Sequence, residues 1–337
     1  MDPRVQKLLD LPQYEQRTPE WYEFRQNLFT ASSIWKIFGT EKQVNSIIYE
    51  KCLPYQNHSF ITSNSMEWGT FYEFVSVQLY ETIYNTKIEE FGCIRHPDYH
   101  FIGASPDGIN VDVLSDRYGR MIEVKNIVNR EITHQPKEDY WIQMQIQMET
   151  CNLNECDFVE TRFKEFIGKT DYIEYTLNET NFCKGIILSF IKREAYLAGD
   201  DPAKIEKKHE YFFDYNKCET CEYIQSETII DEWIATTKNK LKNEYIMYST
   251  RFWYLDEFSC ILVKRNKLWF DSAIEKIKNV WDIIENEKIT GYEHRNTVKK
   301  NSITVTVDED NGSHMIKNMP LNTGVCLIKL DEFGNVL

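Results

Sequence analysis

The sequence predicts a mixed α/β (α+β) fold in which a central mixed sheet is flanked by helices. Apolar residues recur at helical spacing up to residue 84, and short runs rich in Ile, Val and Phe, separated by turn residues, follow up to residue 126. Helical spacing returns at 137–151, and another β-like run comes after it. The order α–β–β–β–α–β predicts one sheet covered by helices.

Four helices are expected before the first strand. Thr18 followed by Pro19 is typical of a helix start, and Thr30 or Ser32 is suited to cap the next helix. The fourth helix is long and amphipathic, and it carries Glu73. The expected helices lie at 19–27, 30–37, 45–52 and 65–84.

The β-like runs are bounded by Pro, Asp, Asn and Gly residues, which are typical of turns. Strands are therefore expected at 87–95, 101–105, 121–126 and 157–163, with a helix at 137–151 between the last two.

The chain is expected to divide into four parts. They are a core at 1–166, an insertion or subdomain at 167–255, a return of the chain to the core at 256–290 and a small β appendage at 291–337. The last two parts are expected to contain a strand at 260–263, a helix at 269–286 and strands at 302–307 and 323–330.

The composition, 42% hydrophobic and 27% charged, is that of a globular protein, and no apolar run reaches the about 20 residues of a membrane helix. The net charge of −14 argues against nonspecific coating of nucleic acid, so a nucleic-acid partner would need a local basic groove. Nine cysteines without a disulfide spacing, and no secretory signal, predict a reducing, intracellular setting. Cys218 and Cys221 form a CxxC pair, which is either a metal or redox site or a plain loop.

The strongest chemical pattern joins a turn to a strand. Ser-Pro-Asp-Gly-Ile at 105–109 is followed, sixteen residues after Asp107, by Glu123 and Lys125 in the expected strand. Because side chains alternate along a strand, Glu123 and Lys125 leave the same face. Asp107 and Glu123 supply the hard oxygen ligands that Mg²⁺ or Mn²⁺ prefers, and Lys125 is suited to orient or help deprotonate a water that attacks a phosphodiester.

This spacing is the PD-(D/E)xK pattern of metal-dependent nucleases, although Pro-Asp turns and exposed Glu-x-Lys pairs also occur as purely structural features. Glu73 offers a further carboxylate, or else belongs to a solvated helix face. Tyr140 and Gln143 share one face of the following helix, where an amide is able to hold a water or a phosphate. Gln145 points elsewhere and is expected to be structural.

Five motifs in order resemble the YqaJ-type viral recombinase family, the lambda-exonuclease type of PD-(D/E)xK nuclease. They lie at 21–34, 68–73, 104–109, 122–125 and 140–145. The resemblance implies a restriction-endonuclease-like core. It also implies an exodeoxyribonuclease that degrades linear double-stranded DNA from an end, 5′ to 3′, and leaves single strands for recombination, repair or replication of a viral genome.

The resemblance further implies two Mg²⁺ or Mn²⁺ ions, with Lys125 catalytic and Gln143 assisting. The implied metal ligands are the side chains of Glu73, Asp107 and Glu123 and the carbonyl of Val124. A pocket for a 5′-phosphate is also implied, and a guanidinium with nearby hydroxyls suits such an anion. The positions carried over to phosphate or DNA binding are Arg25, Thr30, Ser32, Ser105, Arg130 and Tyr140, with Arg130 out of register with the family arginine.

The expected partners are double-stranded DNA ends and a single-strand annealing protein, with no membrane. The expected location is the host cytoplasm, a viral replication site or the nucleus. The resemblance to lambda exonuclease implies a ring-shaped assembly, which an insertion at 167–255 is able to alter, so a homo-oligomer is left open. Asn126 and Ile127 depart from the Cys-Pro that usually follows the family's strand motif.

Two other functions are considered. One is a RecB-like single-strand nuclease whose cysteines bind an iron–sulfur cluster, and the other is a DNA-end-binding or scaffold protein without catalysis. Aromatic residues offer either stacking on DNA bases or core packing: Trp21, Tyr22, Trp35 and Trp141. The basic stretches 204–210 and 295–300 offer either phosphate contacts or a solvated surface.

Overall fold

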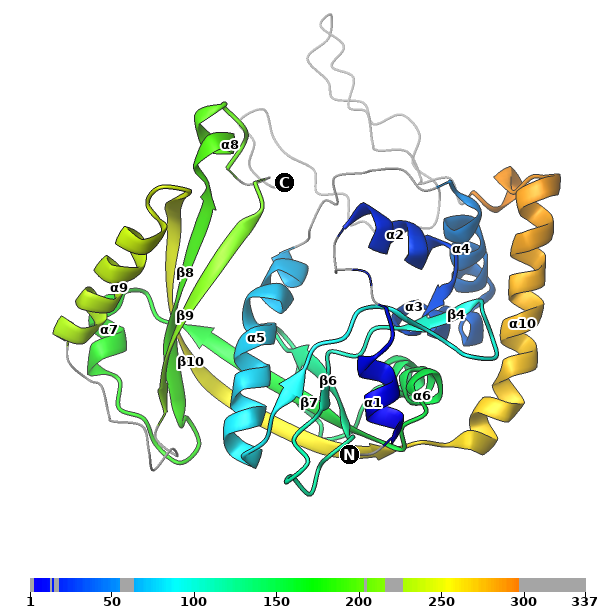
Figure 1. Ribbon diagram of the computed structural model, residues 1–337, viewed down its shortest axis with the longest axis horizontal. Helices are drawn as coiled ribbons and strands as arrows, with labels where there is room; N and C mark the ends of the chain where they lie inside the picture. Colours follow the sequence, from blue (N-terminus) through cyan, green and yellow to red (C-terminus); the bar gives the residue numbers. More distant parts are fainter. Residues whose placement is uncertain are drawn as a thin grey trace, which may run out of the picture. The chain divides into compact units, whose positions relative to one another are not determined.

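The computed structural model describes residues 3–12, 14, 18–54, 64–202, 205–215 and 227–296 (Figure 1). The chain divides into two units, Met1–Tyr292 and Glu293–Leu337, and the strands described below belong to the first. In the second unit the described residues include a 3-10 helix, Glu293–Arg295. The Cys218/Cys221 pair and the strands expected at 302–307 and 323–330 lie outside the described residues.

A seven-stranded mixed sheet forms the centre of the first unit, which confirms the predicted fold class. Its strand order is β2-β5-β6-β7-β10-β8-β9, and β6 and β7 are its parallel pair. The strands are β2 (Ile88–Glu89), β5 (Gly108–Asn110), β6 (Met121–Asn126), β7 (Glu155–Glu165), β8 (Cys183–Lys192), β9 (Lys207–Tyr215) and β10 (Tyr245–Lys264).

A smaller sheet has the order β1-β4-β3, with strands β1 (Phe29–Thr30), β4 (Ile102–Ala104) and β3 (Ile94–Arg95). The parallel pairing of β1 with β4 places Thr30 opposite Gly103, two residues before Ser105. The small sheet therefore brings the N-terminal segment next to the turn that carries Asp107.

The helices of the first unit lie around these sheets (Figure 1). They are α1 (Pro3–Leu9), α2 (Pro19–Gln26), α3 (Ala31–Ile34), α4 (Glu41–Cys52), α5 (Asn64–Tyr84), α6 (Glu138–Cys151), α7 (Lys169–Glu174), α8 (Arg193–Leu197), α9 (Glu227–Leu241) and α10 (Lys267–Thr290), with a 3-10 turn at Trp35–Phe38. Within the described ranges, no helix combines the length and apolar character needed to cross a bilayer.

Helices α5 and α6 cover opposite faces of the strand β6. Ile122 and Val124 pack with Tyr80 of α5, whereas Met121 packs with Met144 and Met148 of α6. Because side chains alternate along a strand, Glu123 and Lys125 lie on the α6 side.

The segment 167–255 continues the central sheet. Its strands β8 and β9 pair with each other, and β8 pairs with the first half of β10. The second half of β10 pairs with β7, so the long β10, yellow in Figure 1, joins this region to the β6 side of the sheet. The expected boundary between 255 and 256 falls inside β10, and the division into four parts stays a prediction.

Three expected elements differ from the structure. The single strand expected at 87–95 is wrong, because β2 pairs with β5 in the large sheet and β3 with β4 in the small one. The helix expected from 45 begins at Glu41, where Thr40 and Gln43 form a capping box. The strand expected at 260–263 is the end of the 20-residue β10.

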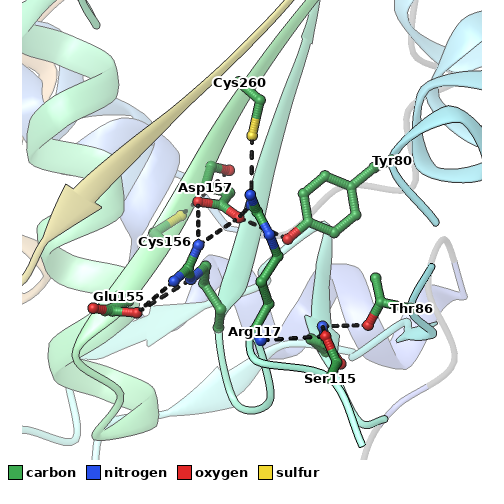
Figure 2. Close-up of polar contacts among 10 residues, drawn as sticks. Tyr80, Thr86, Ser115, Arg117, Glu155, Cys156, Asp157 and Cys260 are labelled. Carbon is green, nitrogen blue, oxygen red and sulfur yellow. Dashed lines mark hydrogen bonds and ion pairs between the residues drawn. The ribbon is translucent and has the colours of Figure 1, made fainter. Parts of the chain in front are cut away.

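A buried carboxylate on β7 anchors the loop that leads into β6. Asp157 forms ion pairs with Arg117 and Arg120 and accepts a hydrogen bond of 2.7 Å from the Tyr80 hydroxyl (Figure 2). The Arg117 guanidinium also lies 3.5 Å from the centroid of the Tyr84 ring. This network joins α5, β7 and the β5–β6 loop, and so fixes where β6 begins.

Candidate active site

The centre of the site is the Glu123 carboxylate on β6, which is fully buried. Oε1 accepts a 2.7 Å hydrogen bond from Gln143 Nε2 and contacts the Lys125 ammonium, and Oε2 accepts a 2.7 Å bond from Gln147 Nε2. Both glutamines lie four residues apart on α6. Since a buried carboxyl group needs such partners, these hydrogen bonds hold the Glu123 side chain in one orientation.

Asp107 reaches the same strand from the turn between β4 and β5. Its Oδ2 accepts a 2.7 Å hydrogen bond from the backbone N–H of Val124. Burial and the charges of Glu123 and Glu73 raise the pKa of Asp107 well above its ordinary value, against the opposing effect of Lys125. The predicted turn-plus-strand pattern therefore does bring two carboxylates and one ammonium together.

Lys125 lies beside Glu123, with its ammonium 5.1 Å from the centroid of the Tyr140 ring. Burial alone would lower the pKa of Lys125, but the charges of Glu123 and Asp107 outweigh burial and raise it above the ordinary value. Lys125 is therefore held as a cation in this environment.

Glu73 lies half-buried on α5, close enough for its charge to act on Asp107. The helix is tied to the catalytic strand by Asn126, whose Nδ2 donates to the Gly69 carbonyl at 2.9 Å. Asn126 Oδ1 accepts hydrogen bonds of 2.7 Å from Ser76 and from Thr161 of β7. The residue that departs from the family pattern thus links the helix carrying Glu73 to β6 and β7.

The residues expected to bind a 5′-phosphate form two neighbouring groups. Arg25 Nη1 donates to Ser105 Oγ at 3.0 Å, and its guanidinium lies 4.3 Å from the centroid of the Trp21 ring. Thr30 Oγ1 lies 3.3 Å from Ser32 Oγ and 2.9 Å from Ser33 Oγ. Because α3 has four residues, hydroxyl groups rather than a helix dipole would supply the donors there.

Arg130 and Tyr140 lie near Lys125, whose ammonium is 5.1 Å from the centroid of the Tyr140 ring. The Arg130 guanidinium forms an ion pair with the buried Glu160 and lies 5.8 Å from the centroid of the Tyr140 ring. The charge of Arg130 is thus already compensated by Glu160. Within the described contacts, Arg130 does not join Arg25 in the group expected to bind the 5′-phosphate.

Sequence reasoning missed two buried residues of the site. Gln147 follows Gln143 by one helical turn, and that i, i+4 spacing was the available signal. Lys51 of α4, also buried, donates a 2.9 Å hydrogen bond to the Arg25 carbonyl, a long-range contact without a local signal. The structural role expected for Gln145 is confirmed, because it donates to the Lys264 carbonyl and accepts from the Asn266 N–H.

The four aromatic candidates take part in packing. Trp21 is buried and meets Tyr22 edge to face, and Trp35 packs against the core that includes α4 and α10. Trp141 meets Trp269 of α10 edge to face, with 5.1 Å between ring centroids. Of the six described cysteines, five are buried.

The donors beside β6 fit a hard divalent cation. Asp107 from the preceding turn and Glu123 of β6 place two carboxylates near the backbone of Val124. A cation would relieve the repulsion between these two carboxylates. In the described ranges, no group of three or more His, Cys, Asp or Glu side chains is placed to hold a metal. A metal that keeps several waters, as Mg²⁺ does, needs only one or two carboxylates.

Residues 20–154 match the sequence model of the YqaJ-like viral recombinase domain. This span contains β4, β6 and α6 with Asp107, Glu123, Lys125 and Gln143. Over these residues the chain therefore matches the YqaJ-like viral recombinase family, the resemblance that its motifs predicted.

Relatives and solved structures show wider similarity. An uncharacterized protein of Acanthamoeba polyphaga mimivirus is 27% identical over 305 residues, which cover 83% of this chain and 54% of that protein, so the chain spans about half of this relative's length. The structure is also similar to an alkaline exonuclease from Laribacter hongkongensis, with a TM-score of 0.47, 17% identity and coverage of 80% of this chain and 94% of the other. A phage-related exonuclease from Haemophilus somnus gives a TM-score of 0.39, 13% identity and coverage of 77% and 94%.

Proposed function

We propose that the protein is a metal-dependent exodeoxyribonuclease that degrades linear double-stranded DNA from its ends, 5′ to 3′. The observation that carries the proposal is the buried Glu123 carboxylate, in contact with Lys125 and next to Asp107, in a YqaJ-like viral recombinase domain. Two carboxylates and a cation at one strand suit phosphodiester hydrolysis, because the reaction needs a positioned water and compensation of negative charge.

Mg²⁺ or Mn²⁺, in two sites, would be held by Glu73, Asp107, Glu123 and the Val124 carbonyl. When bound, such ions lower the pKa of a coordinated water and offset charge on the phosphoryl oxygens. Lys125, held as a cation, would compensate negative charge on the same phosphate. Gln143 donates to Glu123 Oε1, and its carbonyl oxygen would accept a hydrogen bond from a water or a DNA group.

Arg25 and Ser105, with Thr30 and Ser32 nearby, would bind the terminal 5′-phosphate. Hydrolysis in which the 3′ oxygen leaves the phosphorus keeps the phosphate on the 5′ side of the next nucleotide. Each cut would therefore recreate the group that this pocket binds, which favours repeated cleavage in the 5′ to 3′ direction.

The proposed product is a long single strand, which suits transfer to a single-strand annealing protein in viral recombination, repair or replication. Double-stranded DNA ends are the proposed substrate, and Arg130 and Tyr140 are proposed to contact DNA beside Lys125. Assembly into a homo-oligomer stays a prediction.

The deciding experiment uses linear duplexes labelled at the 5′ or the 3′ end, with and without a 5′-phosphate, digested in Mg²⁺ and in EDTA. Early release of 5′-labelled mononucleotides, in Mg²⁺ alone, is expected. Binding of DNA ends without cleavage would replace the proposal with a non-catalytic end-binding protein. Preference for single strands together with absorbance at 410–420 nm would favour the RecB-like alternative.

A further inference from the structure

Gln147 connects the two halves of the proposed site. Its side chain is fully buried, and Nε2 donates to Glu123 Oε2 at 2.7 Å and to the Ser105 carbonyl at 3.4 Å. The hydroxyl of the same Ser105 accepts the 3.0 Å hydrogen bond from Arg25. One amide therefore bridges the carboxylate proposed to bind metal and the residue proposed to line the phosphate pocket.

The orientation of the amide follows from its partners. Turning the Gln147 amide around would place its oxygen against the Glu123 carboxylate and the Ser105 carbonyl, both of which are acceptors. Gln147 Oε1 accepts no hydrogen bond within the described part of the chain, although it is buried. A buried amide left half-satisfied carries a free-energy cost, which its hydrogen bond to the Glu123 side chain offsets.

Gln145 shows what a purely structural glutamine looks like on the same helix. It is equally buried, but its partners are the Lys264 carbonyl and the Asn266 N–H, where β10 meets α10. Gln147 has no such tie to a helix junction, and its two acceptors both belong to the site.

We propose that Gln147 is a positioning residue that orients Glu123 for metal binding and, through the Ser105 carbonyl, keeps the phosphate pocket in register with it. This inference rests on the proposed function. With Gln143 on the other oxygen, Gln147 leaves the Glu123 carboxylate no free rotation, so a cation would meet a preoriented ligand. Without Gln147, Glu123 Oε2 would lose the hydrogen bond that orients it, and the Ser105 carbonyl would lose one contact.

The test compares Gln147→Met with Gln145→Met, since both replace a buried amide of α6 by an apolar chain of similar length. Mn²⁺ binding is measured by calorimetry without DNA, and thermal unfolding is followed in parallel. Gln147→Met should weaken Mn²⁺ binding by about tenfold, whereas Gln145→Met should leave the affinity unchanged. The preference for 5′-phosphorylated over 5′-hydroxyl duplexes should fall roughly threefold in Gln147→Met alone.

Mn²⁺ affinity within twofold of wild type in a folded Gln147→Met protein would overturn the inference, and so would an equal loss in Gln145→Met. If Gln147→Met fails to fold, Gln147→Asn keeps a buried amide that is one methylene too short to reach Glu123, and its Mn²⁺ affinity is judged by the same limits. Wild-type protein that neither binds Mn²⁺ nor cleaves DNA would instead reject the proposed function itself.

Discussion

The Asp107 carboxylate accepts a hydrogen bond from the backbone N–H of Val124, the residue between Glu123 and Lys125. This contact brings the turn after β4 to the middle of β6, so that residues sixteen positions apart in sequence share one site. It also holds Asp107 near two other carboxylates, at a cost in electrostatic free energy that a cation would remove.

Asp107→Asn is therefore expected to abolish cleavage without harming the fold. Because the pKa of Asp107 is raised in the folded protein, the native state binds more protons than the unfolded state above the ordinary value of 3.8. Wild-type stability should consequently fall as the pH rises from 3.8 through the raised pKa, and the variant should lack this dependence. Urea unfolding in EDTA across this range measures both, and near-normal cleavage by the variant at any Mg²⁺ concentration would contradict the site.

Glu123→Ala should behave differently, because Gln143 and Gln147 would keep buried N–H groups without an acceptor. Such groups cost about 1–3 kcal/mol each, so the variant should lose both cleavage and roughly 3 kcal/mol of stability. Urea unfolding of Asp107→Asn and Glu123→Ala side by side checks the difference. Equal stability of the two variants would mean that the glutamine contacts with Glu123 are weak.

Glu73→Gln tests the contribution of α5. If Glu73 completes the metal site, its loss should raise the Mg²⁺ concentration needed for half-maximal cleavage by about tenfold, with little change in melting temperature. Glu81→Gln, eight residues further along the same helix, removes an equal charge away from the site and serves as the control. An unchanged Mg²⁺ titration for Glu73→Gln would return this residue to an ordinary helix surface.

Asp157→Asn tests the buried network of Figure 2. Removing the charge that Arg117 and Arg120 share should cost about 3–5 kcal/mol, because breaking a buried ion pair leaves uncompensated charges. Asp231→Asn, which removes an exposed partner of Lys169, should leave the stability almost unchanged. Chemical denaturation of the two variants distinguishes these values, and a similar small loss in both would mean that the network does not anchor β6.

Lys51→Met tests the buried lysine that donates a hydrogen bond to the Arg25 carbonyl. Burial lowers the pKa of Lys51 to about 8, while Glu50 and Cys93 act to raise it and Arg25 and Lys36 to lower it. Between pH 8 and 10.5 the unfolded state therefore binds more protons, so wild-type stability should rise with pH by up to about 3 kcal/mol relative to the variant. Parallel unfolding curves at pH 7.5 and 10 measure the difference. An equal change in stability with pH for both proteins would mean that burial does not lower the pKa of Lys51.

Local patterns predicted the parts of the site that lie within one element. The period of two in β6 was enough to place Glu123 and Lys125 on one face, and the helical period placed Tyr140 and Gln143 on one face of α6. Contacts between distant segments carry no such period. The separation of 87–95 into two strands depends on which sheet each half joins. Ile88 and Ile94 are the same type of residue in similar apolar runs, so nothing local in the sequence distinguishes the two halves.

Long-range pairing also explains the other misses. The 20-residue β10 has mixed polar and apolar residues because it passes from one part of the sheet to another, so only its last apolar residues resembled a strand. Lys51 and Asp157 are recognised as site and anchor residues only once α4 meets α2 and β7 meets the β5–β6 loop.

Arg25→Ala tests the direction of cleavage. If Arg25 and Ser105 bind a terminal phosphate, wild-type protein should prefer 5′-phosphorylated over 5′-hydroxyl ends, because a guanidinium matches the dianion. Loss of this charge-assisted contact is worth roughly 1.5–3 kcal/mol, so cleavage of the phosphorylated duplex should slow by about one to two orders of magnitude. The hydroxyl duplex should be cleaved at nearly the wild-type rate, and processivity on long DNA should fall.

The matched control for Arg25→Ala is Arg95→Ala. Arg95 is exposed and its guanidinium lies 4.8 Å from the centroid of the Phe24 ring. Arg95→Ala therefore removes a guanidinium near Arg25 that is not one of the proposed phosphate-binding residues. Rates on the four combinations of end and variant separate a pocket effect from a change in local charge. Equal wild-type rates on both ends, or Arg25→Ala slowed equally on both, would remove the 5′-end mechanism and leave the nuclease proposal standing. Cleavage of covalently closed circles as fast as linear DNA would make the protein an endonuclease, since a closed circle offers no terminal phosphate for Arg25 to bind.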